Sequence, residues 1–362
     1  MDKKIFFIYW AKSDFSIIRN IINSFNEDGF IVIEKELSHS KQIHLFKSLG
    51  ININNNSVIN IVYLCAVFFV LNIKSLFYKN ILVLGPNAIY SVLFSVVLKK
   101  NILIHYNELP SFIEKGFINL KSKIDFLVFN KMKNIVVSNK HRLKLFERLG
   151  TPNHKYFVLD NILDLTKNHI SEEKIDITDG KKINLMYTGV LNSNRMIEKL
   201  IKTIGNSTRF NLIIAGFTDD KESLMKLIQN YNNIEFKGAL PQADVLSLIQ
   251  SSCDYGIAFY NMDSLNNKYC APLKIHEYFR FNKLVISFKN PPLVEIENNF
   301  GIIYTINNID EILSDLEFLK IEKRLLNIKN NSFEIFRQKQ NDKFNSEMNN
   351  IIKLFNSDQN FN

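Results

Sequence analysis

The sequence is poor in cysteine, and its three cysteines lie far apart. Cys65, Cys253 and Cys270 form no closely spaced pair, so the pattern predicts neither a zinc site nor a disulfide framework. Tryptophan occurs once, whereas phenylalanine occurs 30 times. This cysteine usage is typical of a reducing compartment, and we expect a cytoplasmic protein.

The sequence also lacks a long hydrophobic run. Its longest apolar stretch, residues 61–71, has eleven residues, whereas a membrane-spanning helix needs about 20. We interpret residues 61–71 as a core helix, with a shallow membrane-inserted helix as the alternative. The first apolar run, residues 5–10, is too short for a secretory signal and is typical of a buried strand.

Positive charge is concentrated in one half of the chain. Residues 1–160 contain 21 Lys and Arg against 11 Asp and Glu, whereas residues 161–362 contain 24 against 25. This asymmetry indicates that the first half meets an anionic partner, either nucleic acid or an anionic membrane. No zinc-finger, helix-turn-helix or basic-aromatic single-strand motif is present, which argues against nucleic acid.

Apolar strand patterns alternate with amphipathic helical patterns along the whole chain. The strands expected in the first half are residues 5–9, 30–34, 81–84, 102–105, 134–138 and 156–159. Those expected in the second half are residues 183–187, 210–215, 234–237, 255–259, 284–287 and 301–304. Such alternation predicts parallel sheets with helices on both faces.

The 362 residues suffice for about two domains. Polar, charged residues near 164–182 indicate a linker. We therefore expect an α/β fold of two doubly wound, Rossmann-like domains that face each other across a cleft. The expected parts are a first domain at 1–165, a linker at 166–182, a second domain at 183–335, and a C-terminal helix and tail at 336–362 that packs toward the first domain.

The segment from Cys270 to Ser287 is the most informative in the chain. Its Pro272 suits the start of a helix, because the fixed φ of proline fits the first turn. Lys274 and Glu277 are three residues apart and share one face of that helix. A carboxylate at the edge of a parallel sheet can accept hydrogen bonds from a ribose. The alternative for Glu277 is a solvated helix position.

A second candidate site follows the strand expected at 183–187. Gly189 lets the backbone approach a phosphate closely, and the start of the helix that follows attracts anions. Arg195 adds a fork of donors that suits a diphosphate. The alternative is an ordinary strand–turn–helix with a surface arginine, because glycine turns of this kind are weak signals.

Polar residues also end the strand expected at 102–105. His105, Asn107 and Glu108 come just before Pro110, at the kind of strand end where parallel sheets bind ligands. His105 or Asn107 can hydrogen-bond a sugar, and Glu108 can orient an acceptor hydroxyl. The alternative is a polar cluster that caps the next helix.

Together these segments resemble glycosyltransferase family 4 of the GT-B fold, of the bacterial surface-polysaccharide type. Residues 272–278 match the family wording Pro-x-Lys-x-x-Glu-Tyr, in which the Glu holds the donor's ribose. The resemblance covers most of the second half well and the first half more loosely. It implies a donor site formed by Gly189, Arg195, Tyr269, Ala271, Pro272, Leu273, Lys274 and Glu277.

The second half departs from the family pattern at two positions. Val190 stands where the family has an Arg, while Arg195 occupies the place of a Lys six residues after the glycine. Tyr269 replaces a second Glu eight residues before Glu277, and Asp263 is a nearby carboxylate. In the first half, the family's segment Glu-x-His-Asp/Glu-x-Pro aligns at residues 105–110.

In that alignment the family His falls on Asn107, and His105 takes the place of the earlier acid. The resemblance implies catalytic roles for His105, Asn107 and Glu108, together with Arg195 on the leaving diphosphate.

A basic and aromatic segment lies between residues 117 and 148. It contains Lys121, Lys123, Lys131, Lys133, Lys140, Arg142, Lys144 and Arg148, interspersed with Phe117, Ile118, Leu120, Phe126 and Phe129. Helices of this composition can lie on anionic lipid surfaces. The alternative is a solvated basic face over a core helix.

The resemblance implies a retaining glycosyltransferase that moves a sugar from a nucleotide-sugar to a lipid-linked saccharide in surface polysaccharide assembly (capsule, O-antigen or exopolysaccharide). It implies neither a metal nor another cofactor, and no Asp-x-Asp signature follows a strand. We expect a cytoplasmic enzyme, peripheral on the inner face of the plasma membrane. The alternatives are a sugar-nucleotide epimerase of the same fold and a non-catalytic, nucleotide-sugar-binding partner subunit.

Overall fold

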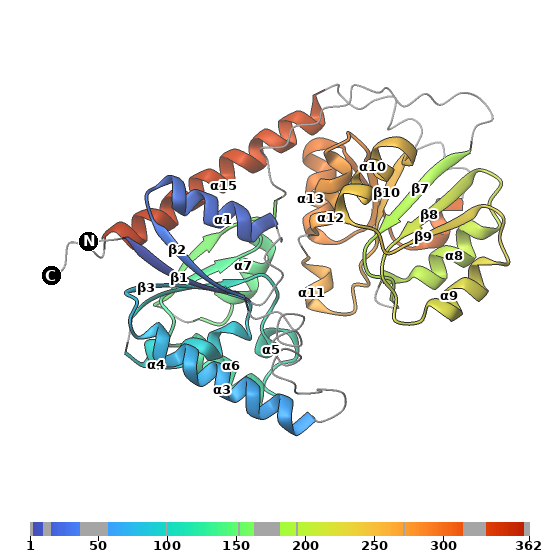
Figure 1. The fold of residues 1–362 in the computed structure, drawn as a ribbon. Helices are drawn as coiled ribbons and strands as arrows, with labels where there is room; N and C mark the ends of the chain where they lie inside the picture. Colours follow the sequence, from blue (N-terminus) through green and yellow to red (C-terminus); the bar gives the residue numbers. More distant parts are fainter. Residues whose placement is uncertain are drawn as a thin grey trace. The chain divides into compact units, whose positions relative to one another are not determined.

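The computed structural model describes residues 3–9, 16–36, 57–98, 100–150, 153–162, 182–192, 195–270, 272–313 and 331–357. The chain divides into two compact units (Figure 1), the first made of Met1–Asp164 and Asp342–Asn362 and the second of Leu165–Asn341. Except for Lys182, the predicted linker at 166–182 lies outside the described residues.

The described part of the first unit contains a six-stranded parallel sheet in the order β2-β1-β3-β4-β5-β6. Its strands are β1 (Lys4–Tyr9), β2 (Ile31–Glu36), β3 (Asn80–Leu84), β4 (Asn101–Tyr106), β5 (Asn134–Val137) and β6 (Lys155–Val158). The helices between them are α1 (Ser16–Glu27), α3 (Ser57–Ser75), η1 (Ala88–Val92), α4 (Leu93–Val97), α5 (Ser111–Glu114), α6 (Leu120–Phe129) and α7 (Lys140–Glu147). The central strands are buried almost throughout, as expected where helices cover both faces of a parallel sheet.

The described part of the second unit also contains a six-stranded parallel sheet, in the order β12-β11-β10-β7-β8-β9. Its strands are β7 (Ile183–Thr188), β8 (Phe210–Ala215), β9 (Ile234–Gly238), β10 (Tyr255–Ala258), β11 (Leu284–Phe288) and β12 (Ile303–Ile306). Its helices are α8 (Ile197–Gly205), α9 (Lys221–Ile228), α10 (Gln242–Ser252), α11 (Leu265–Lys268), α12 (Leu273–Phe279), α13 (Pro291–Phe300) and η3 (Ile309–Leu313). The predicted fold class, two Rossmann-like α/β sheets, is confirmed.

The strand order of the second sheet reverses between β7 and β10. From β7 the chain first builds outward through β8 and β9, and it then returns to place β10 on the other side of β7. The helices that leave two such neighbouring strands lie on opposite faces, which opens a crevice at their carboxyl ends. The fold therefore provides a ligand position beyond Thr188 and Ala258.

One long helix, α15 (Ser332–Ser357), contributes to both units. Its first turns place Phe333 and Phe336 in the core of the second unit. Farther along, Phe355 packs on Phe25 of the first unit, with 5.6 Å between ring centroids, and the Lys343 amine lies 2.6 Å from an Asp160 carboxylate oxygen.

One local prediction is wrong. Residues 61–71 belong to α3, but this part of the helix is not a core helix, since Phe69 is 57% and Val70 is 60% exposed while Leu71 and Asn72 are buried. The N-cap of α7 is Asn139, whose side chain accepts from the Arg142 backbone N–H. Among the described residues, no helix is long and apolar enough to cross a membrane.

Candidate functional site

The turn after β7 requires a glycine. Gly189 has a φ of +111°, a conformation that side chains other than hydrogen rarely adopt. Its N–H donates to Ala215 O at 2.9 Å. A Cβ at the neighbouring Gly216 would lie 1.7 Å from Gly189 O, so the two backbones pack in direct contact. This packing fixes the turn at the carboxyl edge of the sheet.

Two cations lie beside this turn, each against an aromatic face. The guanidinium carbon of Arg195 lies 3.9 Å from the ring centroid of Tyr260, which follows β10. The amine of Lys274, on α12, lies 3.8 Å from the ring centroid of Tyr187, on β7. The Lys274 amine also lies 3.4 Å from the position that a Cβ on Gly189 would occupy. The structure thus brings together Gly189, Arg195 and Lys274, as the sequence predicts.

Both cations have buried nitrogens that bond to nothing in the described residues. The Lys274 Nζ and one terminal nitrogen of Arg195 have no hydrogen-bond partner there. Burial of an ionised group without a partner is costly. Such an arrangement is typical of a functional site, and the acceptor groups of an anion would suit these two donors.

The charges of the site are coupled. Burial and the adjacent Arg195 lower the pKa of Lys274 to about 7, although Glu277 opposes this shift. Burial also raises the pKa of Glu277, while Lys274 and a hydrogen bond with Gln242 of α10 act in the opposite direction. Lys274 and Glu277 thus face each other as their helical spacing predicts, and the site carries more positive than negative charge.

Tyr187, Tyr260 and Gln242 were not found from the sequence. Tyr187 precedes the Gly189 turn by two residues and Tyr260 directly follows the strand expected at 255–259, so each was visible near a strand end. What was missing is the pairing of β7 with β10, which places Tyr187 and the residues that follow β10 at the same edge of the sheet.

The other residues predicted for this site are placed as follows. Pro272 is the N-cap of α12, and Leu273 begins the helix. Tyr269 ends α11 and contacts the amine of Lys268, which lies 5.7 Å from its ring centroid. Ala271 lies outside the described residues. Asp263 is exposed and accepts from the Asn261 side chain at 2.6 Å.

In the first unit, the strand-end cluster is only partly assembled. His105 is 1% exposed, and neither ring nitrogen has a hydrogen-bond partner in the described residues. Burial and the nearby Arg142 lower its pKa to about 3, so the ring is neutral at physiological pH. Asn107 also buries an unpartnered side-chain oxygen, whereas Glu108 is exposed.

Arg142 organises this cluster and takes no part in an exposed basic face. It is 4% exposed, and it donates to Asn107 O and to the Ser138 hydroxyl. Phe129, which the sequence groups with the basic segment, is also fully buried. The exposed part of that segment is therefore smaller than its sequence indicates.

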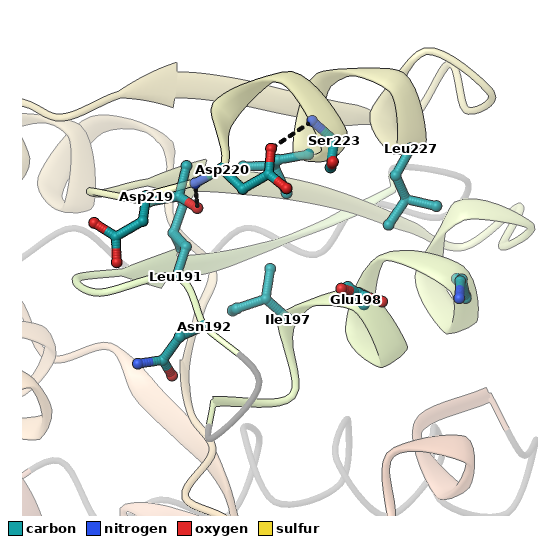
Figure 2. Close-up of a pocket in the computed structure, with 11 residues that line it drawn as sticks. Leu191, Asn192, Ile197, Glu198, Asp219, Asp220, Ser223 and Leu227 are labelled. Carbon is teal, nitrogen blue, oxygen red and sulfur yellow. Dashed lines mark hydrogen bonds between the residues drawn. The ribbon is translucent and has the colours of Figure 1, made fainter.

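A pocket of about 380 Å³ lies beside the Gly189 turn, between α8 and α9 (Figure 2). Leu191, Ile197 and Leu227 contribute apolar surface, and the rim carries Glu198 and the acidic pair Asp219 and Asp220, along with Lys202. Carboxylates repel a diphosphate, so the cationic pair suits an anion better than this pocket does.

No protein-family model matches the sequence, and no curated protein matches it. Several solved structures are similar in fold. HepE of Anabaena, solved with UDP-glucose, has a TM-score of 0.68 at 14% identity, over 98% of this chain and 99% of its own.

Two further structures match over nearly their whole length. An α,α-trehalose-phosphate synthase (UDP-forming) from Burkholderia xenovorans has a TM-score of 0.60 at 7% identity, over 98% of this chain and 100% of its own. A putative UDP-N-acetylglucosamine 2-epimerase from Listeria monocytogenes has a TM-score of 0.58 at 12% identity, over 100% of this chain and 98% of its own. These similarities show that the chain has the GT-B fold.

Proposed function

We propose that this protein is a glycosyltransferase that takes a sugar from a nucleotide-sugar. The observation that carries the proposal is the pair of cations Arg195 and Lys274 beside Glu277, at the switch point of the second sheet. Each has a buried nitrogen without a hydrogen-bond partner in the described residues. Similar folds are solved with UDP-glucose or named as UDP-forming, which supports a nucleotide diphosphate as the anion.

In the proposed complex, Arg195 and Lys274 bind the diphosphate and Glu277 accepts hydrogen bonds from the ribose. As the bond to the sugar breaks, the two cations stabilise the charge that grows on the leaving diphosphate. The Gly189 turn lets the backbone approach the phosphates, because no side chain intervenes. The carboxylate of Glu277 partly offsets the lowering of the Lys274 pKa by burial and by Arg195.

We extend the proposal to transfer with retention of configuration, without a metal, to a lipid-linked saccharide of a bacterial surface polysaccharide. The acceptor side is assigned to His105, Asn107 and Glu108 of the first unit. His105 is neutral and can donate or accept one hydrogen bond to a sugar hydroxyl, whereas exposed Glu108 is accessible to an acceptor. A donor phosphate oxygen takes the acceptor proton.

The donor assignment is tested by melting the protein with a panel of nucleotide-sugars that includes UDP-glucose. A ligand at 100 times its dissociation constant adds about 2.7 kcal/mol of stability. For domains of this size, each kcal/mol raises the melting temperature by about 2–4 °C. We expect at least one nucleotide-sugar to raise the melting temperature, and Glu277→Ala to lose that rise because the ribose loses its acceptor.

Glu198→Ala is the matched control, because Glu198 is an exposed carboxylate on α8 near the same turn but in the acidic pocket. This variant should respond to the nucleotide-sugar like the unmodified protein. A panel without any shift, or an equal shift in Glu277→Ala, would contradict the donor site.

One face of the first unit supports a membrane-bound acceptor. Twelve of the eighteen exposed large hydrophobic side chains in the described residues fall between Phe69 and Leu127. We call these twelve the apolar face: Phe69, Val70, Ile73, Phe77, Phe94, Val97, Leu98, Phe117, Ile118, Leu120, Ile124 and Leu127. Soluble monomers rarely expose so many in one region.

The helices that carry the apolar face are bonded side by side on one side of the first sheet (Figure 1). The Asn72 amide of α3 donates to Tyr90 O at 2.8 Å, and the Tyr90 hydroxyl donates to Asp125 of α6. Exposed Lys115, Lys121 and Lys123 lie among the apolar residues. Apolar side chains interspersed with lysine suit an anionic lipid surface, and we propose that this face docks there.

Vesicle sedimentation tests the docking. We expect the protein to bind vesicles that contain phosphatidylglycerol and not pure phosphatidylcholine vesicles. Ile118→Glu combined with Leu120→Glu should weaken binding at least tenfold, since these side chains are 84% and 73% exposed and would insert. Phe217→Glu, at a position in the second unit that is 58% exposed, should change nothing. Equal binding by all three proteins would refute the docking face.

A sugar-nucleotide epimerase is the second candidate, because a putative epimerase from Listeria monocytogenes has a similar fold. The two activities separate cleanly in an assay. An epimerase converts a nucleotide-sugar with no acceptor present, whereas a transferase releases the nucleotide only as a sugar is transferred to an acceptor or to water.

A further inference from the structure

We propose that Tyr187 and Tyr260 are positioning residues, which hold Lys274 and Arg195 in place for the donor diphosphate without cancelling their charge. This inference rests on the proposed donor site and adds two residues to it. The carrying observation is that each cation lies against its own ring, at 3.8 Å and 3.9 Å from the ring centroids.

A long cationic side chain at a binding site has to be held, because fixing it only on binding costs conformational entropy. A carboxylate partner would hold it but would also neutralise it. The face of an aromatic ring attracts a cation through its quadrupole and carries no net charge. Two rings with one carboxylate, Glu277, therefore fix two cations and leave positive charge for the ligand.

The ring contacts also leave the donor groups of the cations available. One terminal nitrogen of Arg195 and the amine nitrogen of Lys274 lie buried against these rings and bond to no other described group. A diphosphate can accept from them without displacing either ring. The aromatic contacts should then persist in the complex, so they favour binding and do not compete with it.

Both rings are themselves held firmly. Tyr187 is fully buried, and its hydroxyl donates to Val190 O at 2.8 Å, which ties the ring to the Gly189 turn. Tyr260, two residues after β10, is 6% exposed. Burial raises the pKa of both hydroxyls, so both tyrosines stay neutral and the cations meet uncharged rings.

The test changes the charge distribution of a ring while keeping its shape. Tyr260→Phe keeps the aromatic face, and phenylalanine carrying five ring fluorines at position 260 reverses the quadrupole. Calorimetric titration of the full-length protein with pyrophosphate reports on the cation pair alone, and titration with UDP adds the base and ribose. We expect Tyr260→Phe to bind both ligands within about twofold of the unmodified protein, and the fluorinated protein to bind both about tenfold more weakly.

Tyr187→Phe is the second variant, and it should also retain the affinity because it retains the face under Lys274. A purely structural role for residue 260 would respond to shape and not to ring fluorination. Equal or tighter binding by the fluorinated protein would overturn the positioning role. If the unmodified protein still binds UDP in that case, the donor site itself is not contradicted. If the unmodified protein binds neither pyrophosphate nor UDP, the donor site itself is wrong, and the positioning role is refuted with it.

Discussion

Lys274→Met should make the protein more stable and nearly inactive. The amine of Lys274 is buried beside Arg195 and has no hydrogen-bond partner in the described residues, so its removal relieves an unfavourable burial. An unsatisfied buried polar group costs about 1–3 kcal/mol. Methionine fills the same space without that cost, and the melting temperature should rise by several degrees.

Turnover should fall in the same variant by about 100- to 1,000-fold, the usual effect of removing one preorganised group from the developing charge of a leaving group. Melting curves and steady-state rates with the nucleotide-sugar found by thermal shift measure the two effects. Lys226→Met is the control, because that lysine is exposed on α9 of the same unit and forms an ion pair with exposed Glu222. A less stable Lys274→Met protein would show that the lysine serves the fold, and a fully active one would show that turnover does not need its charge.

Donor binding should take up a proton above neutral pH. The pKa of Lys274 in the unliganded protein is lowered to about 7, so at pH 8 most molecules carry a neutral amine. A bound diphosphate favours the charged form, and binding therefore draws a proton from solution. Affinity should fall by up to about tenfold for each pH unit above 7, until the pH reaches the pKa of the complex.

Calorimetry in buffers of different ionisation enthalpy measures this uptake directly. The groups around Lys274 set the window: Arg195 and burial lower its pKa, whereas Glu277 and Cys270 raise it. Protonation of Glu277, whose own pKa is raised, should weaken binding on the acid side. Lys274→Met should bind with an affinity that no longer falls between pH 7 and pH 9, and a slope that survives in this variant would assign the proton elsewhere.

The lowered pKa of Lys274 affects folding stability with a pH dependence opposite to that of donor affinity. Between about pH 7 and pH 10.5 the unfolded chain keeps the Lys274 proton while the folded chain has lost it. Stability rises with pH wherever the unfolded state binds more protons. The contribution of this residue to the free energy of unfolding therefore increases over the range in which donor affinity declines.

Local features of the sequence predicted local features of the structure well. Strand β8 is confirmed as Phe210–Ala215, because a largely apolar run between Arg209 and Gly216 marks both ends. The shared face of Lys274 and Glu277 follows from helix geometry, and the Gly189 turn from its position after a strand. Each of these depends on residues that are close in the chain.

Features that depend on sheet order could not be predicted in this way. Tyr187 and Tyr260 meet the same pair of cations because β10 pairs with β7, seventy residues away in sequence. Nothing near either residue encodes that pairing. The exposure of α3 was missed for a related reason, because an apolar helix has the same sequence pattern in a core and on a surface.

The division of α15 between the units affects the order in which the protein can fold. A ribosome releases residues 183–313, with all the strands of the second sheet, before it makes the turns of α15 that cover Phe25 with Phe355. Domains usually fold in the order of synthesis. Here the first unit to be made must wait for the last helix, so the second unit can be complete while the first still lacks part of its core.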